Sequence, residues 1–145
     1  MQLEYLIWAI TKKNPLKKKP ILSLKSRMFL SKKIIKNNKK IKIKNYDEYL
    51  KSNKTIELIK FLKNKNKRAK LYFIMGSDSL LEFHKWDSWN KFEDLCNIVI
   101  FHRQGYLKKI LACKAYKLLG KNKIKFLNSK IAKISSSKIR KNYLV

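Results

Sequence analysis

Residues 71–83 read LYFIMGSDSLLEF, and this stretch decides the fold class. Its first five residues form a continuous apolar run, which is typical of a strand buried on both faces. Gly76 ends the run, and apolar residues return at once with helical character. The stretch therefore predicts a strand, a tight turn and a helix.

The same alternation of strands and helices continues on both sides of this stretch. Further short apolar runs predict strands at residues 6–10 and 98–101, and residues 41–43 and 124–127 are two further strand candidates. Apolar residues at helical spacing predict helices at residues 21–35, 55–62 and 110–119, and a last short helix starting at Ser135. Strands that alternate with helices indicate an α/β fold with a largely parallel sheet. We expect one domain over residues 1–145.

The overall composition limits the class of protein. A chain of 145 residues and 17.4 kDa is the size of one ordinary domain. Its 45% hydrophobic and 12% aromatic content excludes a disordered or collagen-like chain. It contains neither an apolar run long enough to span a membrane nor a secretory signal, so we expect a cytoplasmic protein without a membrane partner. Cys96 and Cys113 are expected to be buried free thiols.

The formal net charge of +28 invites a nucleic-acid interpretation, but the kind of basic residue argues against it. The chain has 33 lysines and 4 arginines, whereas phosphate and base readers favour the planar guanidinium of arginine. Residues 71–101 are different, because they hold five of the nine acidic residues and only two lysines. The residues of this stretch therefore follow the lysine-rich composition of the rest of the chain least.

Two segments contain groups suited to a nucleotide. Asp78, two positions after Gly76, can accept two hydrogen bonds from a ribose diol, or it can simply cap the helix that follows. Ser135, Ser136 and Ser137 begin a helix that carries Arg140, which suits a polyphosphate; serine capping with a solvated arginine is the alternative. Parallel sheets bind ligands at the carboxyl ends of their strands. The interpretation of these two segments as one nucleotide site therefore requires that the fold brings them together.

Other candidate residues are less specific. Trp86 and Trp89 lie three positions apart, so on a helix they would share a side, where either ring could stack on a flat ligand or pack in the core. The only two histidines, His84 and His102, exclude a histidine-rich metal site, and His84 cannot be assigned as a general base from its position. Lys17 lies in a lysine run that could meet a phosphate.

Taken together, these motifs resemble those of the bacterial nicotinate mononucleotide adenylyltransferases. The resemblance rests on FIMGSDSLLEFHKW at residues 73–86, HRQGY at 102–106 and ISSSKIR at 134–140, in the family's order and spacing. NPLK at residues 14–17 and TIE at 55–57 also match. It implies a Rossmann-like nucleotidyltransferase fold and an enzyme of NAD biosynthesis, whose substrates are ATP, carried with Mg²⁺, and nicotinate mononucleotide.

The resemblance also implies roles for single residues. Those expected to bind ATP are Gly76, Asp78, Ile134, Ser136, Ser137 and Arg140, and Arg140 is also expected to act in catalysis. Those expected to bind nicotinate mononucleotide are Thr55, Trp86 and Lys17. Ser77 stands where the family usually has alanine or glutamine, Gln104 replaces proline, and Ser137 replaces threonine.

One departure from the family is large. The family's G-x-F-[DN]-P-x-H-x-G-H motif, whose histidines contact the ATP phosphates, does not occur in this sequence. We therefore expect an N-terminally truncated domain lacking one strand–helix unit of roughly 20 to 30 residues, with exposed strand edges and apolar surface.

Three hypotheses follow for the function of the protein: it is a longer, active adenylyltransferase, an inactive remnant of that enzyme, or, less favoured, a basic nucleic-acid-binding protein. The sequence decides neither the oligomeric state nor the choice between nicotinate and nicotinamide.

Overall fold

The structure is a computed structural model that describes residues 3–14, 16, 20–102 and 105–128. The chain divides into two compact units, Met1–Lys65 and Asn66–Val145, each of which is described by itself. The expected single domain over residues 1–145 stays a prediction.

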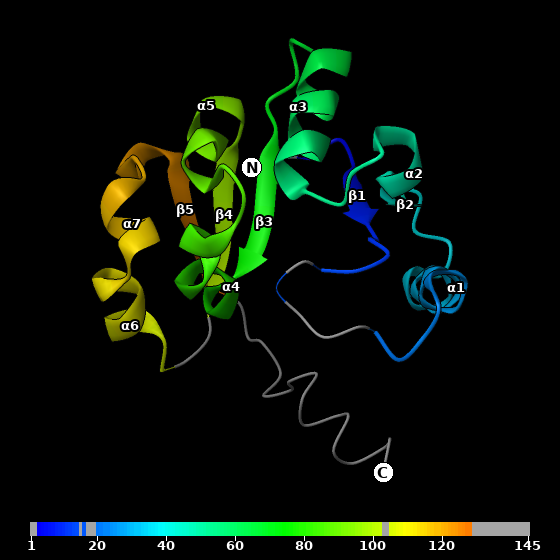
Figure 1. Ribbon diagram of the computed structural model, residues 1–145, viewed down its shortest axis with the longest axis horizontal. Coiled ribbons are helices and arrows are strands. Elements are labelled where there is room, and N and C mark those ends of the chain that lie inside the picture. Colours follow the sequence, from blue (N-terminus) through cyan, green and yellow to red (C-terminus); the bar gives the residue numbers. More distant parts are fainter. Residues whose placement is uncertain (1–2, 15, 17–19, 103–104, 129–145) are drawn as a thin grey trace. The chain divides into compact units, whose positions relative to one another are not determined.

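Unit 1 contains a pair of parallel strands. Strand β1 (Leu6–Ala9) pairs with β2 (Ile41–Lys44) in parallel, with Leu6 opposite Ile41. Helix α1 (Leu24–Ile35) connects them, as a parallel pair requires (Figure 1). Helices α2 (Asp47–Leu50) and α3 (Thr55–Lys65) follow.

Helix α1 begins later than the sequence pattern predicts. We expected it to start beside Pro20, but its first residue is Leu24. Ser23 caps the helix, because its side-chain oxygen accepts a hydrogen bond from the Ser26 backbone N–H at 3.0 Å. The exposed apolar residues Ile21 and Leu22 precede the cap and had extended the apparent pattern.

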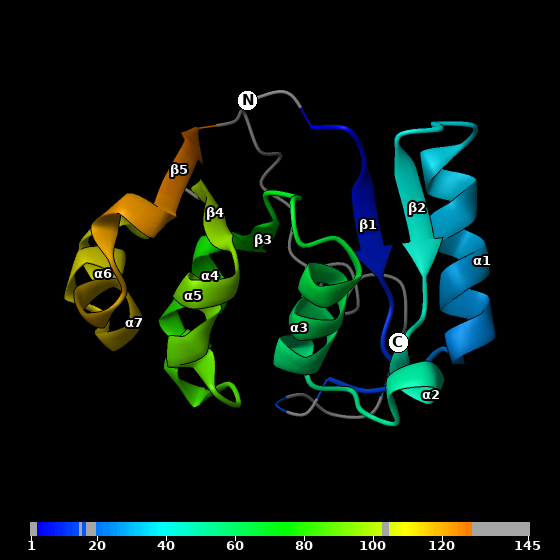
Figure 2. The same cartoon turned by 90° about the horizontal axis from the view of Figure 1, so that it is seen from above.

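Unit 2 contains three parallel strands in the order β3–β4–β5. These strands are β3 (Tyr72–Gly76), β4 (Asn97–His102) and β5 (Ile124–Asn128). The helices between them lie on one face of the sheet (Figure 2). They are α4 (Ser77–Leu81), α5 (Phe92–Leu95), α6 (Leu107–Ala112) and α7 (Lys114–Leu118), with 3₁₀ turns at Phe83–Lys85, Trp89–Lys91 and Lys121–Lys123. The predicted α/β class with parallel strands is confirmed.

Two predicted helices of unit 2 differ from the expectation: one is divided into two, and the other is shifted by two residues. The segment 110–119 was predicted as one helix, but Cys113 has an extended conformation (φ −75°, ψ 149°) that separates α6 from α7. The helix expected at residues 79–83 starts earlier, at Ser77, and ends at Leu81. The helix predicted to start at Ser135 lies outside the described residues.

The core of unit 2 is aromatic and aliphatic. Phe83 and Phe92 are fully buried, and their ring centroids lie 4.9 Å apart in an edge-to-face arrangement. Phe73, from β3, packs on both rings at 6.4 and 5.4 Å. Ile98 and Ile100 of β4 are also fully buried. This core fixes the position of the segment that joins β3 to α5.

Exposed apolar side chains are present among the residues that the structure describes. In unit 1, Phe29 is 68% exposed and Ile34 is 71% exposed. The strand–helix unit that we expected to be missing stays a prediction. No described helix combines the length and the apolar character needed to cross a bilayer.

The two cysteines are both free, as predicted, but the expected burial holds only for Cys96 and is wrong for Cys113. Burial raises the pKa of Cys96 to about 11, so at pH 8 its thiolate fraction falls to roughly one in a thousand. Cys113 is only half-buried. We expect Ellman's reagent to modify Cys113 in the folded protein at least about tenfold faster than Cys96. Peptide mapping after timed labelling of the native protein checks this. Equal labelling rates of the two cysteines in the native state would contradict the prediction, whereas equal rates in urea are expected because neither thiol is then buried.

Candidate functional site

The structure describes four of the nine site residues that the resemblance implies. Gly76, Asp78 and Trp86 belong to unit 2, and Thr55 belongs to unit 1. The other five lie outside the described residues: Lys17, Ile134, Ser136, Ser137 and Arg140. Their roles stay predictions, as does the anion site expected at Ser135–Ser137.

The turn between β3 and α4 places Gly76 and Asp78 at the carboxyl end of the sheet. Gly76 is the last residue of β3 and the N-cap of α4, with an extended backbone (φ −82°, ψ 161°). Asp78 lies in the first turn of α4, where the helix dipole favours a carboxylate. The alternative interpretation of Asp78 as the N-cap is therefore wrong, because Gly76 occupies that position.

Ser77 holds this turn against the neighbouring strand. Its side chain is fully buried, and its hydroxyl donates a hydrogen bond to the Phe101 carbonyl oxygen at 3.0 Å. Phe101 is the register partner of Gly76 in the parallel β3–β4 ladder. Sequence reasoning did not give Ser77 a role, because a serine in a turn resembles a solvent-facing polar residue.

Trp86 lies at the edge of the aromatic core of unit 2. Its ring centroid is 5.4 Å from that of Phe83 and 5.9 Å from that of Phe73, both in edge-to-face arrangements. Trp86 is extended and lies between two 3₁₀ turns, so it does not share a continuous helix with Trp89. Trp89 still contacts Phe83, at 6.3 Å. Trp86 is half-buried, which leaves part of it accessible to a ligand.

Thr55 is the first residue of α3 in unit 1, as the sequence predicted. Glu57 lies in the first turn of this helix, and its carboxylate pairs with Lys60 at 3.0 Å. Thr55 is half-buried, and Ile56 beside it is almost completely buried. The helix start that carries Thr55 is thus fixed by a buried apolar neighbour.

The two histidines have buried ring atoms. Within the described part of the chain, Nδ1 of His84 and Nδ1 of His102 are buried without a hydrogen-bond partner. His102 is the last residue of β4, one position after Phe101. Among the described residues no group of three acidic, histidine or cysteine side chains comes together in a way that could hold a metal.

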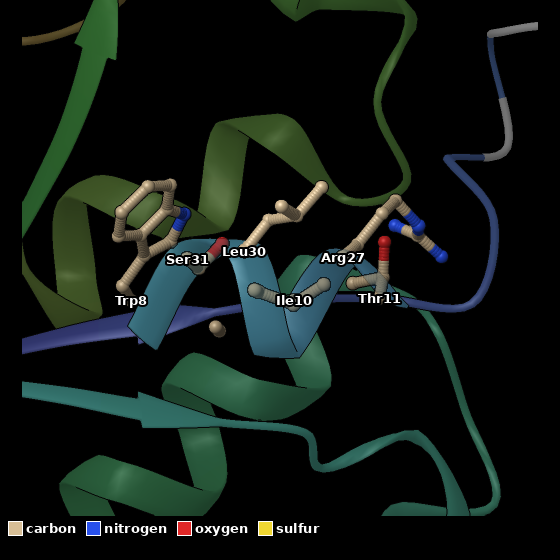
Figure 3. Close-up of a pocket in the computed structure, with 7 residues that line it drawn as sticks. Trp8, Ile10, Thr11, Arg27, Leu30 and Ser31 are labelled. Carbon is tan, nitrogen blue, oxygen red and sulfur yellow. The ribbon is translucent and has the colours of Figure 1, made fainter. Parts of the chain in front are cut away.

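An open pocket of about 400 Å³ lies in unit 1. It is lined by residues of β1, the following loop and α1, among them Trp8, Arg27 and Ser31 (Figure 3). The Arg27 guanidinium donates hydrogen bonds to the backbone carbonyls of Lys12 and Leu22 at 2.9 and 3.3 Å. Arg27 therefore has a structural role in joining α1 to the loop after β1.

Three comparisons with known proteins agree with one another. A family model described as cytidylyltransferase-like matches residues 1–142. A protein of Pelagibacter ubique (strain HTCC1062) named "Probable nicotinate-nucleotide adenylyltransferase" is 48% identical over 97% of this chain and 78% of its own length. A protein of the same name from Clostridium acetobutylicum is 35% identical over 97% of this chain and 72% of its own length. That from Aquifex aeolicus (strain VF5) is 33% identical, over 72% of this chain and 62% of its own length.

Solved structures show the same fold. Plasmodium falciparum nicotinic acid mononucleotide adenylyltransferase complexed with NaAD has a TM-score of 0.72 and 23% identity, covering 96% of this chain and 69% of that one. The same enzyme complexed with APC gives a TM-score of 0.72 at 22% identity, over 96% and 68% of the two chains. At these identities the likeness concerns the fold alone. The family model and the more similar relatives show more: this chain belongs to the cytidylyltransferase-like family, among its nicotinate-nucleotide adenylyltransferases.

Proposed function

We propose that the protein transfers the adenylyl group of ATP to nicotinate mononucleotide, giving deamido-NAD and pyrophosphate. The observation that carries this proposal is the β3–α4 turn, which brings Gly76 and Asp78 to the carboxyl end of a parallel sheet in a chain of this family. Such ends are where open α/β sheets bind nucleotides. The expected cytoplasmic location remains a prediction beside this proposal.

The reaction needs alignment and charge neutralisation more than proton transfer. The 5′-phosphate oxygen of nicotinate mononucleotide attacks the α-phosphorus of ATP in line, forming one P–O bond while the bond to the β-phosphate bridging oxygen breaks. Pyrophosphate leaves with the electron pair of the broken P–O bond and therefore with the negative charge on its oxygen. Asp78 holds the ribose of ATP, and Arg140 stabilises the charge that develops on the phosphates. Mg²⁺ enters with ATP as part of the substrate, since Mg²⁺ is commonly bound through phosphates with few protein ligands.

The nicotinate half of the site is assigned to Thr55, Trp86 and Lys17. Thr55 offers a hydroxyl for a hydrogen bond, and the half-buried Trp86 offers an aromatic ring that could stack on a pyridine ring. Lys17 supplies a cation for the substrate phosphate. The Phe73 and Phe83 rings that pack on Trp86 hold it in place.

The direct test is product formation by the full chain. Mg²⁺-ATP and nicotinate mononucleotide are incubated with the protein, and deamido-NAD and pyrophosphate are measured by chromatography and a pyrophosphate assay. Equal amounts of both products support the proposal, and nicotinamide mononucleotide in a parallel reaction reveals the substrate preference. Binding of both substrates without product would support the inactive-remnant hypothesis. Salt-sensitive binding to any DNA duplex, with no nucleotide binding, would favour the nucleic-acid alternative.

Trp86→Ala is expected to raise the dissociation constant for nicotinate mononucleotide about tenfold while leaving that for ATP within about twofold, because one aromatic stacking contact contributes roughly 1–3 kcal/mol. Isothermal titration with each substrate checks this. Trp8→Ala is the control, because Trp8 is an exposed tryptophan of unit 1 for which we propose no role. Equal weakening of both substrates by Trp86→Ala would contradict the assignment.

A further inference from the structure

Two side chains from the segment between β2 and α3 bind the backbone of the loop that follows β1. The Lys12 backbone N–H donates a hydrogen bond to Asp47 Oδ2 at 2.6 Å. The Asn53 side-chain amide donates a hydrogen bond to the Lys13 carbonyl oxygen at 3.1 Å. All four residues belong to unit 1. The two bonds thus join segments that lie 35 and 40 positions apart in the sequence.

Both segments leave the same edge of the β1–β2 pair. Ala9 and Lys44 are the last register partners of these parallel strands, so the two segments begin at neighbouring carboxyl ends. Asn45 continues the connection, because its side-chain amide donates a hydrogen bond to the Ile10 carbonyl oxygen at 2.7 Å. The carboxyl ends of parallel strands are where open α/β sheets bind ligands. The bonds made by Asp47 and Asn53 therefore lie at the ligand-binding edge of unit 1.

The two segments lead to different parts of the proposed nicotinate mononucleotide site. Asn53 lies two positions before Thr55, the first residue of α3, which is assigned to the ring. The loop after β1 continues in the sequence to Lys17, which is assigned to the phosphate. A ligand that contacts both segments binds tightly only if their spacing matches its own length. We propose that Asp47 and Asn53 are positioning residues that set this spacing for nicotinate mononucleotide; this inference rests on the proposed function.

The surface location of these bonds separates positioning from folding. Both hydrogen bonds are exposed, so water can replace a lost partner and neither loss leaves a buried unpaired group. The core of unit 1 contains other residues, such as Ile56 and Ile59 of α3. The charge of Asp47 is also unfavourable for a nearby phosphate, so its removal alone would not weaken the binding of an anion. A weaker binding of the substrate in Asp47→Ala would therefore report a change in position.

The test compares nicotinate mononucleotide with nicotinate riboside, the same molecule without its 5′-phosphate. The ratio of their dissociation constants, measured by isothermal titration of the full chain, reports whether ring and phosphate are bound together. We expect the wild-type protein to prefer the mononucleotide by at least about tenfold. Asp47→Ala and Asn53→Ala should each lower this ratio at least about threefold, with the dissociation constants for the riboside and for ATP within about twofold of wild type. Asp47→Asn keeps an acceptor oxygen and should keep most of the ratio.

Two control variants remove similar groups without touching these bonds. Glu48→Ala removes the same charge one position further on, from a carboxylate that pairs with the Lys12 Nζ at 3.0 Å. Asn38→Ala removes a comparable bond, in which Asn38 Oδ1 accepts from the Lys40 backbone N–H at 3.0 Å, before the amino end of β2. Both should keep the wild-type ratio.

The outcomes separate this inference from the proposed function. A wild-type ratio in both Asp47→Ala and Asn53→Ala would overturn the positioning role alone, because the wild-type protein would still recognise ring and phosphate together. An equal loss of affinity for ATP and the mononucleotide would also overturn it, since the variants would then disturb the whole fold, which a lowered Tm would confirm. If the wild-type protein does not bind nicotinate mononucleotide, the proposed function fails first and the inference fails with it.

Discussion

Asp78→Ala is expected to weaken ATP binding roughly 300-fold, because it removes two charge-assisted hydrogen bonds to the ribose, together worth about 3–4 kcal/mol. The carboxylate lies in the first turn of α4 at the carboxyl end of β3, where a nucleotide is expected in a parallel sheet. Nicotinate mononucleotide binding should stay within about twofold of the wild-type value, since the assigned groups are Thr55, Trp86 and Lys17. Isothermal titration with each substrate measures both effects.

Asp94→Ala is the matched control for this prediction. Asp94 is an exposed carboxylate in the first turn of α5, so the variant removes the same charge from a comparable position in another helix. Binding of 2′,3′-dideoxy-ATP provides an internal control, since Asp78→Ala should weaken it only slightly. A loss of ATP affinity equal to that of Asp94→Ala would refute the ribose role. An equal loss for dideoxy-ATP would indicate that the variant disturbs the nucleotide site as a whole rather than the ribose contact, because loss of a negative charge does not by itself weaken the binding of a polyanion.

Strands were predicted more accurately than helices in this chain. Strands β1, β3 and β4 contain short apolar runs, and β4 shows why this signal is reliable: Ile98, Val99 and Ile100 are all buried, so their apolar character is required on both faces of the sheet. Helix ends depend instead on single capping residues. Ser23 caps α1, which therefore begins at Leu24, three residues beyond the predicted start, and the extended backbone at Cys113 divides a continuous apolar pattern into two helices.

The turn that carries Gly76 and Asp78 was predicted correctly, because a glycine after an apolar strand marks a turn. The roles of these two residues come from the resemblance to the family and stay predictions. Ser77 was missed because the partner of its hydroxyl, the Phe101 carbonyl, lies 24 residues away in sequence. A contact of this kind follows from the pairing of β3 with β4 and leaves no local pattern. Arg27 is a second example, since its guanidinium binds backbone carbonyls that periodicity does not reveal.

Phe83→Ala is expected to lower the free energy of unfolding of unit 2 by about 3–5 kcal/mol. The side chain is fully buried, and its ring lies 4.9–6.4 Å from the rings of Phe92, Trp86, Trp89 and Phe73. Its removal leaves a cavity among four aromatic rings, which cannot all move to fill it. Since a domain has a total stability of only about 5–15 kcal/mol, a large fraction would be lost.

Urea unfolding followed by tryptophan fluorescence measures this change, because Trp86 and Trp89 lie on the Phe83 ring. Phe29→Ala is the control: Phe29 is 68% exposed on α1, so its loss should change stability by less than about 0.5 kcal/mol. Phe83→Leu fills much of the cavity and should recover part of the loss. If Phe83→Ala costs no more than Phe29→Ala, the aromatic cluster does not support unit 2. Trp86 would then be held by other contacts, and its proposed role in binding nicotinate would lose its structural basis.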